Sequence, residues 1–186
     1  MTLMQRAGSG VRLVPDPGSV DSRKARARLA IIGIGSPLAG DDGVGPAIVR
    51  ELRQRLPEDE HIILHTLEGD LLEIADWLDR AERFIFVDAV AGREAGTIVI
   101  GQPVERAYAP SFHQADIGTI MRSLALLGVA DPFPSWEVWG VTILPPTELG
   151  EGLSPAVATA ADAMVERLCT LLGAMPGRSP VTVRRS

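Results

Sequence analysis

Short apolar runs that alternate with helical patterns constrain this sequence more than any other feature. Mainly apolar runs of strand length occupy residues 29–34, 61–66, 84–87, 97–100 and 136–143. Short runs of this kind are typical of strands buried on both faces of a sheet. Between them, apolar residues recur at helical spacing in 44–56, 70–78, 117–127 and 154–172. The alternation predicts an α/β fold: a doubly wound, mostly parallel five-stranded sheet with helices on both faces, whose strand order the pattern does not give.

The two ends of the chain differ from this pattern. Residues 1–27 and 174–186 are rich in glycine, proline, serine and charge, and neither shows a sustained period. We therefore expect a flexible N-terminal extension at 1–27, a single α/β domain at 28–173 and a flexible C-terminal tail at 174–186. A chain of 186 residues suits one such domain with one core.

Composition narrows the classes of function. The formal net charge is −6, and the only basic runs lie at 23–28 and 184–185, outside the predicted domain. We therefore expect no nucleic-acid partner. No apolar stretch reaches the length of a membrane span, and charged residues interrupt the N-terminal segment. These features predict a cytoplasmic protein without a signal peptide. The single cysteine, Cys169, allows no internal disulfide and no cysteine-based zinc site, and we expect it to be buried on a helix.

Parallel α/β sheets bind ligands beyond the carboxyl ends of their strands, which directs attention to the loop after residues 29–34. A dinucleotide fingerprint fits this loop badly, because Leu38 occupies the third glycine position and Pro37 interrupts the turn. Asp41 and Asp42 would also repel a pyrophosphate at the helix N-terminus. Interaction with the helix dipole explains one of these carboxylates. The presence of two carboxylates indicates that one of them has a function beyond this interaction. Spacing alone does not decide between a structural and a functional role.

Two further side chains are candidates for chemistry. Asp88 follows the apolar run 84–87, where it either faces the same sheet edge or bonds nearby backbone. His113 lies in the long segment 101–117, and a lone histidine in such a segment has either an incidental or a functional role.

The other two histidines, His61 and His65, lie four residues apart on one predicted strand, and we interpret both as structural. Convergence of Asp42, Asp88 and His113 at one edge would make a site for a divalent metal such as nickel or zinc. The same three groups could instead carry out acid–base chemistry without a metal. Topology implies the convergence of the two aspartates, whereas for His113 it is an assumption.

Several segments, in the same order along the chain, resemble the hydrogenase maturation protease family. They are GIGSPLAGDDGVG at 33–45, FVDAV at 86–90, SFHQ at 111–114, GV at 140–141 and GLSP at 152–155. The first segment is the most specific, and the resemblance covers about residues 29–172, nearly the whole predicted domain.

The resemblance implies an endopeptidase that removes the C-terminal peptide of a nickel-loaded nickel–iron hydrogenase large-subunit precursor and recognises the bound nickel. It implies that Asp42, Asp88 and His113 form the metal-binding and catalytic site. Nickel would be supplied by the substrate, and no organic cofactor would take part. The chain departs from the family pattern in the turn at 66–70, which reads Thr-Leu-Glu-Gly-Asp where members often carry an Asp-Gly-Gly-Thr-like turn.

Two other interpretations remain open. The first is a Rossmann-like nucleotide-binding module, which Gly33 and Gly35 favour and which Pro37 and the two aspartates oppose. The second is a protease of related fold with another target. The sequence contains neither the Gly-x-Ser-x-Gly elbow nor the His-Glu-x-x-His motif, and Cys169 lies in mid-helix, a poor place for a nucleophile.

Overall fold

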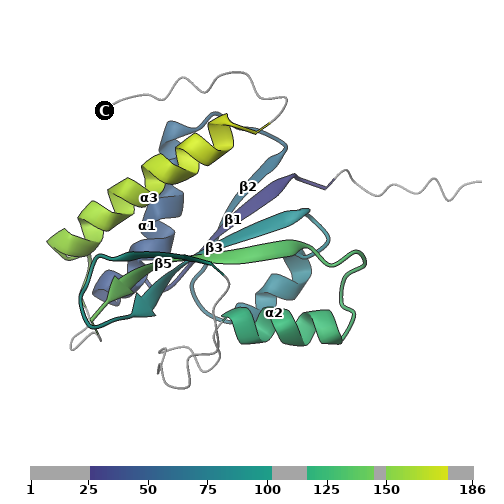
Figure 1. Ribbon diagram of the computed structural model, residues 1–186, viewed down its shortest axis with the longest axis horizontal. Helices are drawn as coiled ribbons and strands as arrows, with labels where there is room; N and C mark the ends of the chain where they lie inside the picture. The colour runs from purple at the N-terminus through teal and green to yellow at the C-terminus, as the bar shows by residue number, and fades with distance from the viewer. Residues whose placement is uncertain (1–25, 102–116, 145–149, 176–186) are drawn as a thin grey trace, which may run out of the picture.

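One five-stranded sheet organises the chain (Figure 1). The computed structural model describes residues 26–101, 117–144 and 150–175. The strands are β1 (Leu29–Ile34), β2 (Ile62–Leu67), β3 (Arg83–Ala91), β4 (Ile98–Gly101) and β5 (Ser135–Ile143). Their order across the sheet is β2-β1-β3-β5-β4. The first four are mutually parallel, and β4 pairs antiparallel with β5 at the edge. The predicted fold class is confirmed, and the structure adds the strand order.

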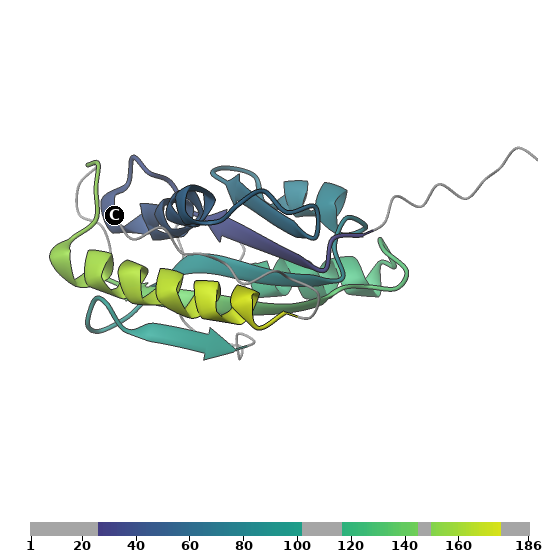
Figure 2. The same ribbon diagram turned by 90° about the horizontal axis from the view of Figure 1, so that it is seen from above.

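Helices cover both faces of the sheet (Figures 1 and 2). The α-helices are α1 (Val44–Arg55), α2 (Ile117–Leu126) and α3 (Pro155–Gly173). The 3-10 helices are η1 (Gly40–Gly43) and η2 (Leu71–Trp77). Helices α1 and α3 contact each other on one face, and α2 contacts η2 on the other. Within the described residues, no helix is long and apolar enough to span a membrane.

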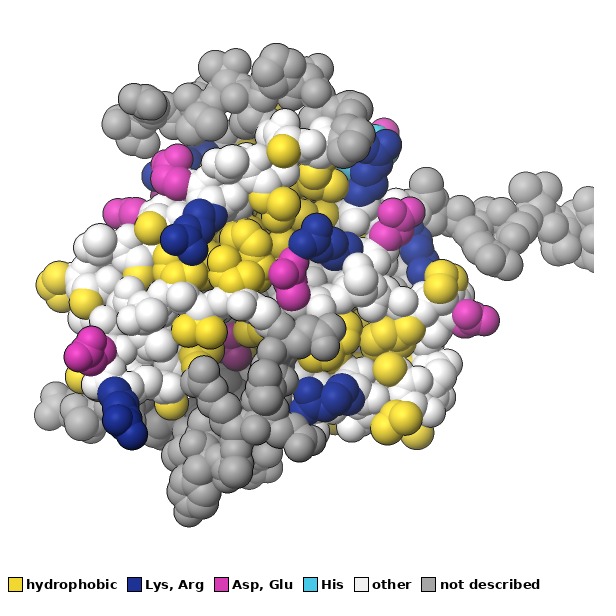
Figure 3. Space-filling model, viewed as in Figure 1, with side chains coloured by type: hydrophobic (Ala, Val, Ile, Leu, Met, Phe, Trp, Pro, Cys, Tyr) yellow, Lys and Arg dark blue, Asp and Glu magenta, His cyan; other side chains and the backbone are white. Residues whose placement is uncertain are grey.

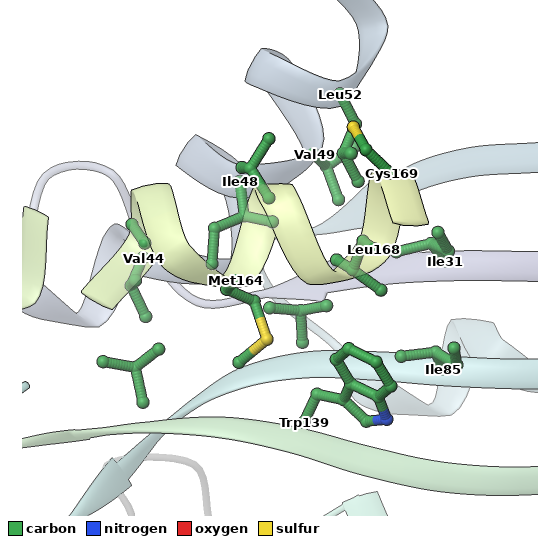
Figure 4. Packing of buried hydrophobic residues seen from close by; sticks show 14 of the residues in the cluster. Ile31, Val44, Ile48, Val49, Leu52, Ile85, Trp139, Met164, Leu168 and Cys169 are labelled. Atoms are coloured by element: carbon green, nitrogen blue, oxygen red, sulfur yellow. The ribbon is translucent and has the colours of Figure 1, made fainter. Parts of the chain in front are cut away.

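The core consists of two layers that share the sheet. On the α1 and α3 face, Trp139 packs with Met164 and Leu168 (Figure 4). On the α2 and η2 face, Phe84 and Phe86 belong to the second layer. Strand β3 contributes to both layers, because successive side chains point to opposite faces. Each fully buried large apolar side chain contributes roughly 1.5–3 kcal/mol relative to an exposed one. This two-sided burial is the reason that the β3 sequence reads as a continuous apolar run.

The elements differ from the sequence expectations in two places. The helix expected at 70–78 is the 3-10 helix η2, which Asp70 begins by accepting a hydrogen bond from the Leu72 amide at 2.8 Å. A short segment suits the tighter 3-10 geometry. Strand β3 is longer than the expected 84–87, because β5 pairs with it as far as Ala91. The prediction that Asp88 follows the strand is therefore wrong: Asp88 lies within β3.

Charged side chains are dispersed on the face shown in Figure 3, which has the orientation of Figure 1. Arginines and carboxylates lie scattered around a central hydrophobic region, and some of them adjoin. Two ion pairs join elements that are distant in sequence: Arg83 on β3 pairs with Glu137 on β5, and Arg55 on α1 pairs with Glu166 on α3. Exposed pairs of this kind contribute up to about 1 kcal/mol each, so apolar packing dominates the stability of this face.

A stacked arrangement of rings lies beside the edge strand β2. The His65 ring stacks on Trp77 with 4.1 Å between centroids, and the Arg80 guanidinium lies 4.5 Å from the Trp77 centroid. Burial lowers the pKa of His65, and the charges of Arg53 and Arg80 lower it further, against an opposing contribution from Glu73. The folded protein therefore favours neutral His65.

This preference predicts a pH-dependent stability. The unfolded chain binds the His65 proton at about the ordinary pKa of 6.5, whereas the folded chain binds it only at lower pH. The contribution of neutral His65 is complete above that value and is lost as the pH falls toward the folded pKa. Urea unfolding midpoints measured at pH 7.5 and 5.5 should therefore differ less for His65→Gln than for the wild type. Equal differences in the two proteins would contradict the assignment, and His61→Gln, at an exposed histidine, is the control.

Candidate functional site

The strand order has a switch point between β1 and β3. From β1 the chain continues to β2 on one side, and it then crosses to β3 on the other side. In open parallel sheets, ligands bind at such a switch point, outside the carboxyl ends of the strands. The loop after β1 and the distal part of β3 lie at this switch point. Asp42 lies on the first of these segments and Asp88 on the second.

Asp42 is held in a tight loop at the start of α1. It lies in the 3-10 helix η1, and its Oδ2 accepts a hydrogen bond from the Ser36 amide at 2.8 Å. Its side chain is largely buried, with 9% of the residue exposed. Gly35 makes this geometry possible, because its φ is +128° and an added Cβ would lie 1.9 Å from the Asp42 carbonyl oxygen. The loop therefore fixes the Asp42 carboxylate in one place.

Asp88 lies level with the end of β1 even though it is within β3. The register pairs Gly33 with Val87, so the next position of β3, Asp88, is opposite Ile34, the last residue of β1. Strand alternation places Asp88 on the same sheet face as Phe86. The 3-10 helix that carries Asp42 contacts β3. The structure thus brings the segments of Asp42 and Asp88 together at the carboxyl edge of the sheet.

The third predicted site residue, His113, lies outside the described residues. Among the residues that are described, no group of three histidine, cysteine or acidic side chains is arranged to hold a metal ion. Cys169 is buried in the core layer beneath α3, as expected from the sequence.

Comparison with known proteins identifies the fold. No protein-family model matches the chain, and no curated protein sequence matches it significantly. Solved structures do match. The hydrogenase maturating endopeptidase HybD from E. coli has a TM-score of 0.61 and 23% identity over 78% of this chain and 91% of that one. An Escherichia coli endopeptidase solved in solution has a TM-score of 0.62 and 25% identity over 78% and 91%. The [NiFe] hydrogenase maturation protease HycI from Thermococcus kodakarensis KOD1 has a TM-score of 0.61 and 20% identity over 82% and 96%. This chain has the hydrogenase maturation protease fold.

Within this maturation protease fold, the two adjacent aspartates have different partners. Asp41 Oδ1 accepts a hydrogen bond from the Ser154 amide at 2.6 Å, and its Oδ2 accepts one from the Ser154 hydroxyl at 2.9 Å. Ser154 occupies the N-cap position of α3, but its hydroxyl makes no capping bond to its own helix. Asp41 thus binds the residue at the start of α3, whereas Asp42 accepts a hydrogen bond within its own loop. The sequence left this division open, because nothing local links residues 41 and 154.

The glycines of the first loop also find a structural role in the maturation protease fold. An added Cβ at Gly33 would lie 2.4 Å from the Gly45 carbonyl oxygen, and one at Gly45 would lie 2.4 Å from the carbonyl oxygens of Ile34 and Val87. These glycines let α1 begin directly against β1 and β3. The two aspartates precede the helix at the place where a dinucleotide fold would bind pyrophosphate. Carboxylates at that position favour a cationic ligand over a phosphate.

The close approach at Gly35 gives a test of the loop. Gly35→Ala should displace the Asp42 segment and reduce the free energy of unfolding by about 1–3 kcal/mol, because the new methyl group collides with backbone at a strained φ. Gly69→Ala is the matched control, since an added Cβ there meets nothing within 4 Å. Chemical denaturation of both variants measures the effect. Similar stabilities for the two variants would show that the loop relaxes around the methyl group.

Proposed function

We propose that this chain is an endopeptidase that removes the C-terminal peptide from the nickel-loaded large-subunit precursor of a nickel–iron hydrogenase. The observation that carries the proposal is the position of Asp42 and Asp88 at the β1–β3 switch point of a maturation protease fold. Similar structures bear the titles of hydrogenase maturation endopeptidases and proteases. An enzyme that recognises a metal-loaded substrate needs ligands at an accessible edge, and this edge supplies carboxylates.

We further propose that Asp42, Asp88 and His113 together form the metal-binding and catalytic site. Ile117 begins α2 and is buried in the layer on the same sheet face as Asp88. His113 precedes Ile117 by four residues, and a chain of that length spans at most about 14 Å. This tether keeps His113 within a limited distance of the start of α2. One imidazole and two carboxylates suit nickel, and three protein ligands leave coordination positions open.

The open positions explain how the substrate would be recognised. None of the proposed ligands is a thiolate, so the site has no soft ligand of its own. Nickel held by cysteine thiolates of the precursor would complete its coordination sphere with Asp42, Asp88 and His113. The metal then belongs to the substrate and forms a bridge between the two proteins. In that position it can polarise the scissile carbonyl or activate a water molecule.

The proposal also names a partner, a cellular compartment and an alternative function. The proposed partner is the precursor and the proposed compartment is the cytoplasm, because a chain with a single cysteine forms no internal disulfide and needs no oxidising environment.

The alternative is a protease of the same fold with another target. The exposed turn at Glu68, Gly69 and Asp70, which departs from the family pattern, favours it.

The ligand roles predict the effects of two substitutions. Asp42→Asn and His113→Ala should each abolish removal of the C-terminal peptide and leave the fold intact, because each removes one ligand of the proposed site. Mass spectrometry of the precursor after incubation measures processing, and circular dichroism checks folding. Asp162→Asn, at an exposed aspartate in the middle of α3, is the control and should process normally. Normal processing by either site variant would remove that residue from the site.

The bridging role predicts dependence on nickel in the substrate. The purified protein should hold little metal and should leave a nickel-free precursor uncut, because its three ligands alone make a modest site. Parallel assays on the precursor with and without nickel provide the measurement. A resident zinc ion that activates water would cut both forms at equal rates, and that result would overturn the bridging mechanism. Failure to cut either form would favour a protease with another target.

A further inference from the structure

The loop that carries Asp42 is fastened to the start of α3 by side-chain and backbone bonds. Both carboxylate oxygens of Asp41 accept hydrogen bonds from Ser154, which lies 113 residues later in the chain. The backbone reinforces this contact. The Gly40 amide donates to the Gly150 carbonyl at 2.6 Å, and the Gly150 amide donates to the Leu38 carbonyl at 3.1 Å. Ala39 and Gly150 form an isolated parallel bridge.

The same loop is attached on its other side to the sheet. The Gly35 amide donates to the Leu67 carbonyl at the end of β2, at 3.2 Å. Directly after Ala39, η1 forms a single tight turn in which the Asp42 amide donates to the Ala39 carbonyl at 3.3 Å. Residues 39 and 40 are therefore held by the segment before α3 and residue 35 by the sheet. Asp42 follows these fixed points directly, and the Ser36 amide binds its carboxylate.

Charge gives a reason for the arrangement. Adjacent carboxylates repel each other, and the N-terminus of a helix favours a nearby negative charge. Asp41 lies at the N-terminus of the 19-residue helix α3, where two donors bind it. The charge of Asp41 is thus satisfied by the start of α3, whereas Asp42 binds the Ser36 amide of its own loop.

We propose that Asp41 and Ser154 are positioning residues, which hold the η1 turn so that Asp42 reaches its ligand. This inference rests on the proposed function for its catalytic consequence, but the geometric part is independent of it. Neither residue touches the substrate in this arrangement. Each acts through the position of Asp42.

The Ser36 amide reports on the position of the Asp42 carboxylate, because it donates a hydrogen bond to that carboxylate. Hydrogen exchange at this amide, followed by NMR, requires no substrate. Asp41→Ala should speed hydrogen exchange at the Ser36 amide about tenfold. The turn would lose stabilisation equal to the net free energy of about one hydrogen bond. Ser154→Ala should have a smaller effect in the same direction, because the Ser154 amide still donates to Asp41. This milder variant tests the proposal even if Asp41→Ala does not fold.

Activity on the nickel-loaded precursor separates positioning from ligation. Asp41→Ala should lower kcat about tenfold with little change in KM. Asp41→Asn should retain most of kcat, because an amide oxygen accepts from the Ser154 amide and the amide group donates to the Ser154 hydroxyl. A metal ligand or catalytic carboxylate would instead lose as much activity in the Asn variant as in the Ala variant. Glu166→Gln, which removes one of the two carboxylate partners of Arg55 from the middle of α3, is the control for general destabilisation and should leave both readouts unchanged.

The outcomes separate this inference from the proposed function. Unchanged exchange at Ser36 in Asp41→Ala and Ser154→Ala would overturn the positioning role, whatever the enzyme cleaves. Equal kcat losses in Asp41→Asn and Asp41→Ala would also overturn it and would assign Asp41 to the site itself. A wild-type protein that cleaves no precursor would overturn the proposed function, while accelerated exchange in the variants would still support the positioning of Asp42.

Discussion

The architecture of the site depends on one close approach between a helix and two strands. Helix α1 begins so near the ends of β1 and β3 that a single Cβ at Gly45 would overlap two carbonyl oxygens. Gly33 permits the same contact from the strand side. This packing sets the height of the η1 turn above the sheet, and with it the level of Asp42. Because the β1–β3 register brings Asp88 to the end of β1, the same contact also determines how the two carboxylates are presented.

The adjacent aspartates show how one short loop can combine stability with chemistry. Asp41 bonds the start of α3, and Asp42 accepts a hydrogen bond from the Ser36 amide within its own loop. A capping interaction stabilises a helix by about 1 kcal/mol, so Asp41 offsets part of the repulsion that the pair introduces. The loop thereby keeps a buried acidic side chain at a sheet edge without dedicating both carboxylates to the site.

Most helices and strands could be predicted from the sequence because their buried residues follow a regular apolar pattern. The β1 run Leu29–Ile34 is buried throughout and β5 is buried from Trp139 to Ile143, so the apolar pattern alone identifies them. It did not predict the extent of β3, because Asp88 interrupts the apolar run and residues 88–91 are only partly buried; they are strand through pairing with β5. The antiparallel direction of β4 is likewise set by tertiary pairing. At the site, topology predicted the common edge of Asp42 and Asp88, whereas the contact of Asp41 with Ser154 joins distant parts of the chain that no local pattern relates. The place of His113 stays a prediction.

The contact between Asp41 and Ser154 has a consequence for the order of assembly during synthesis. The loop of Asp42 is made early, whereas its anchor lies 113 residues later, at the start of the last helix. Contacts that close such long loops form late, since the entropy of closure must be offset first. A ribosome-bound chain that has completed β1 to β5 still lacks the element that immobilises this loop. The loop of Asp42 is therefore among the last parts of the described fold to be fixed, and a nascent or truncated chain carries Asp41 and Asp42 without the contact that holds them.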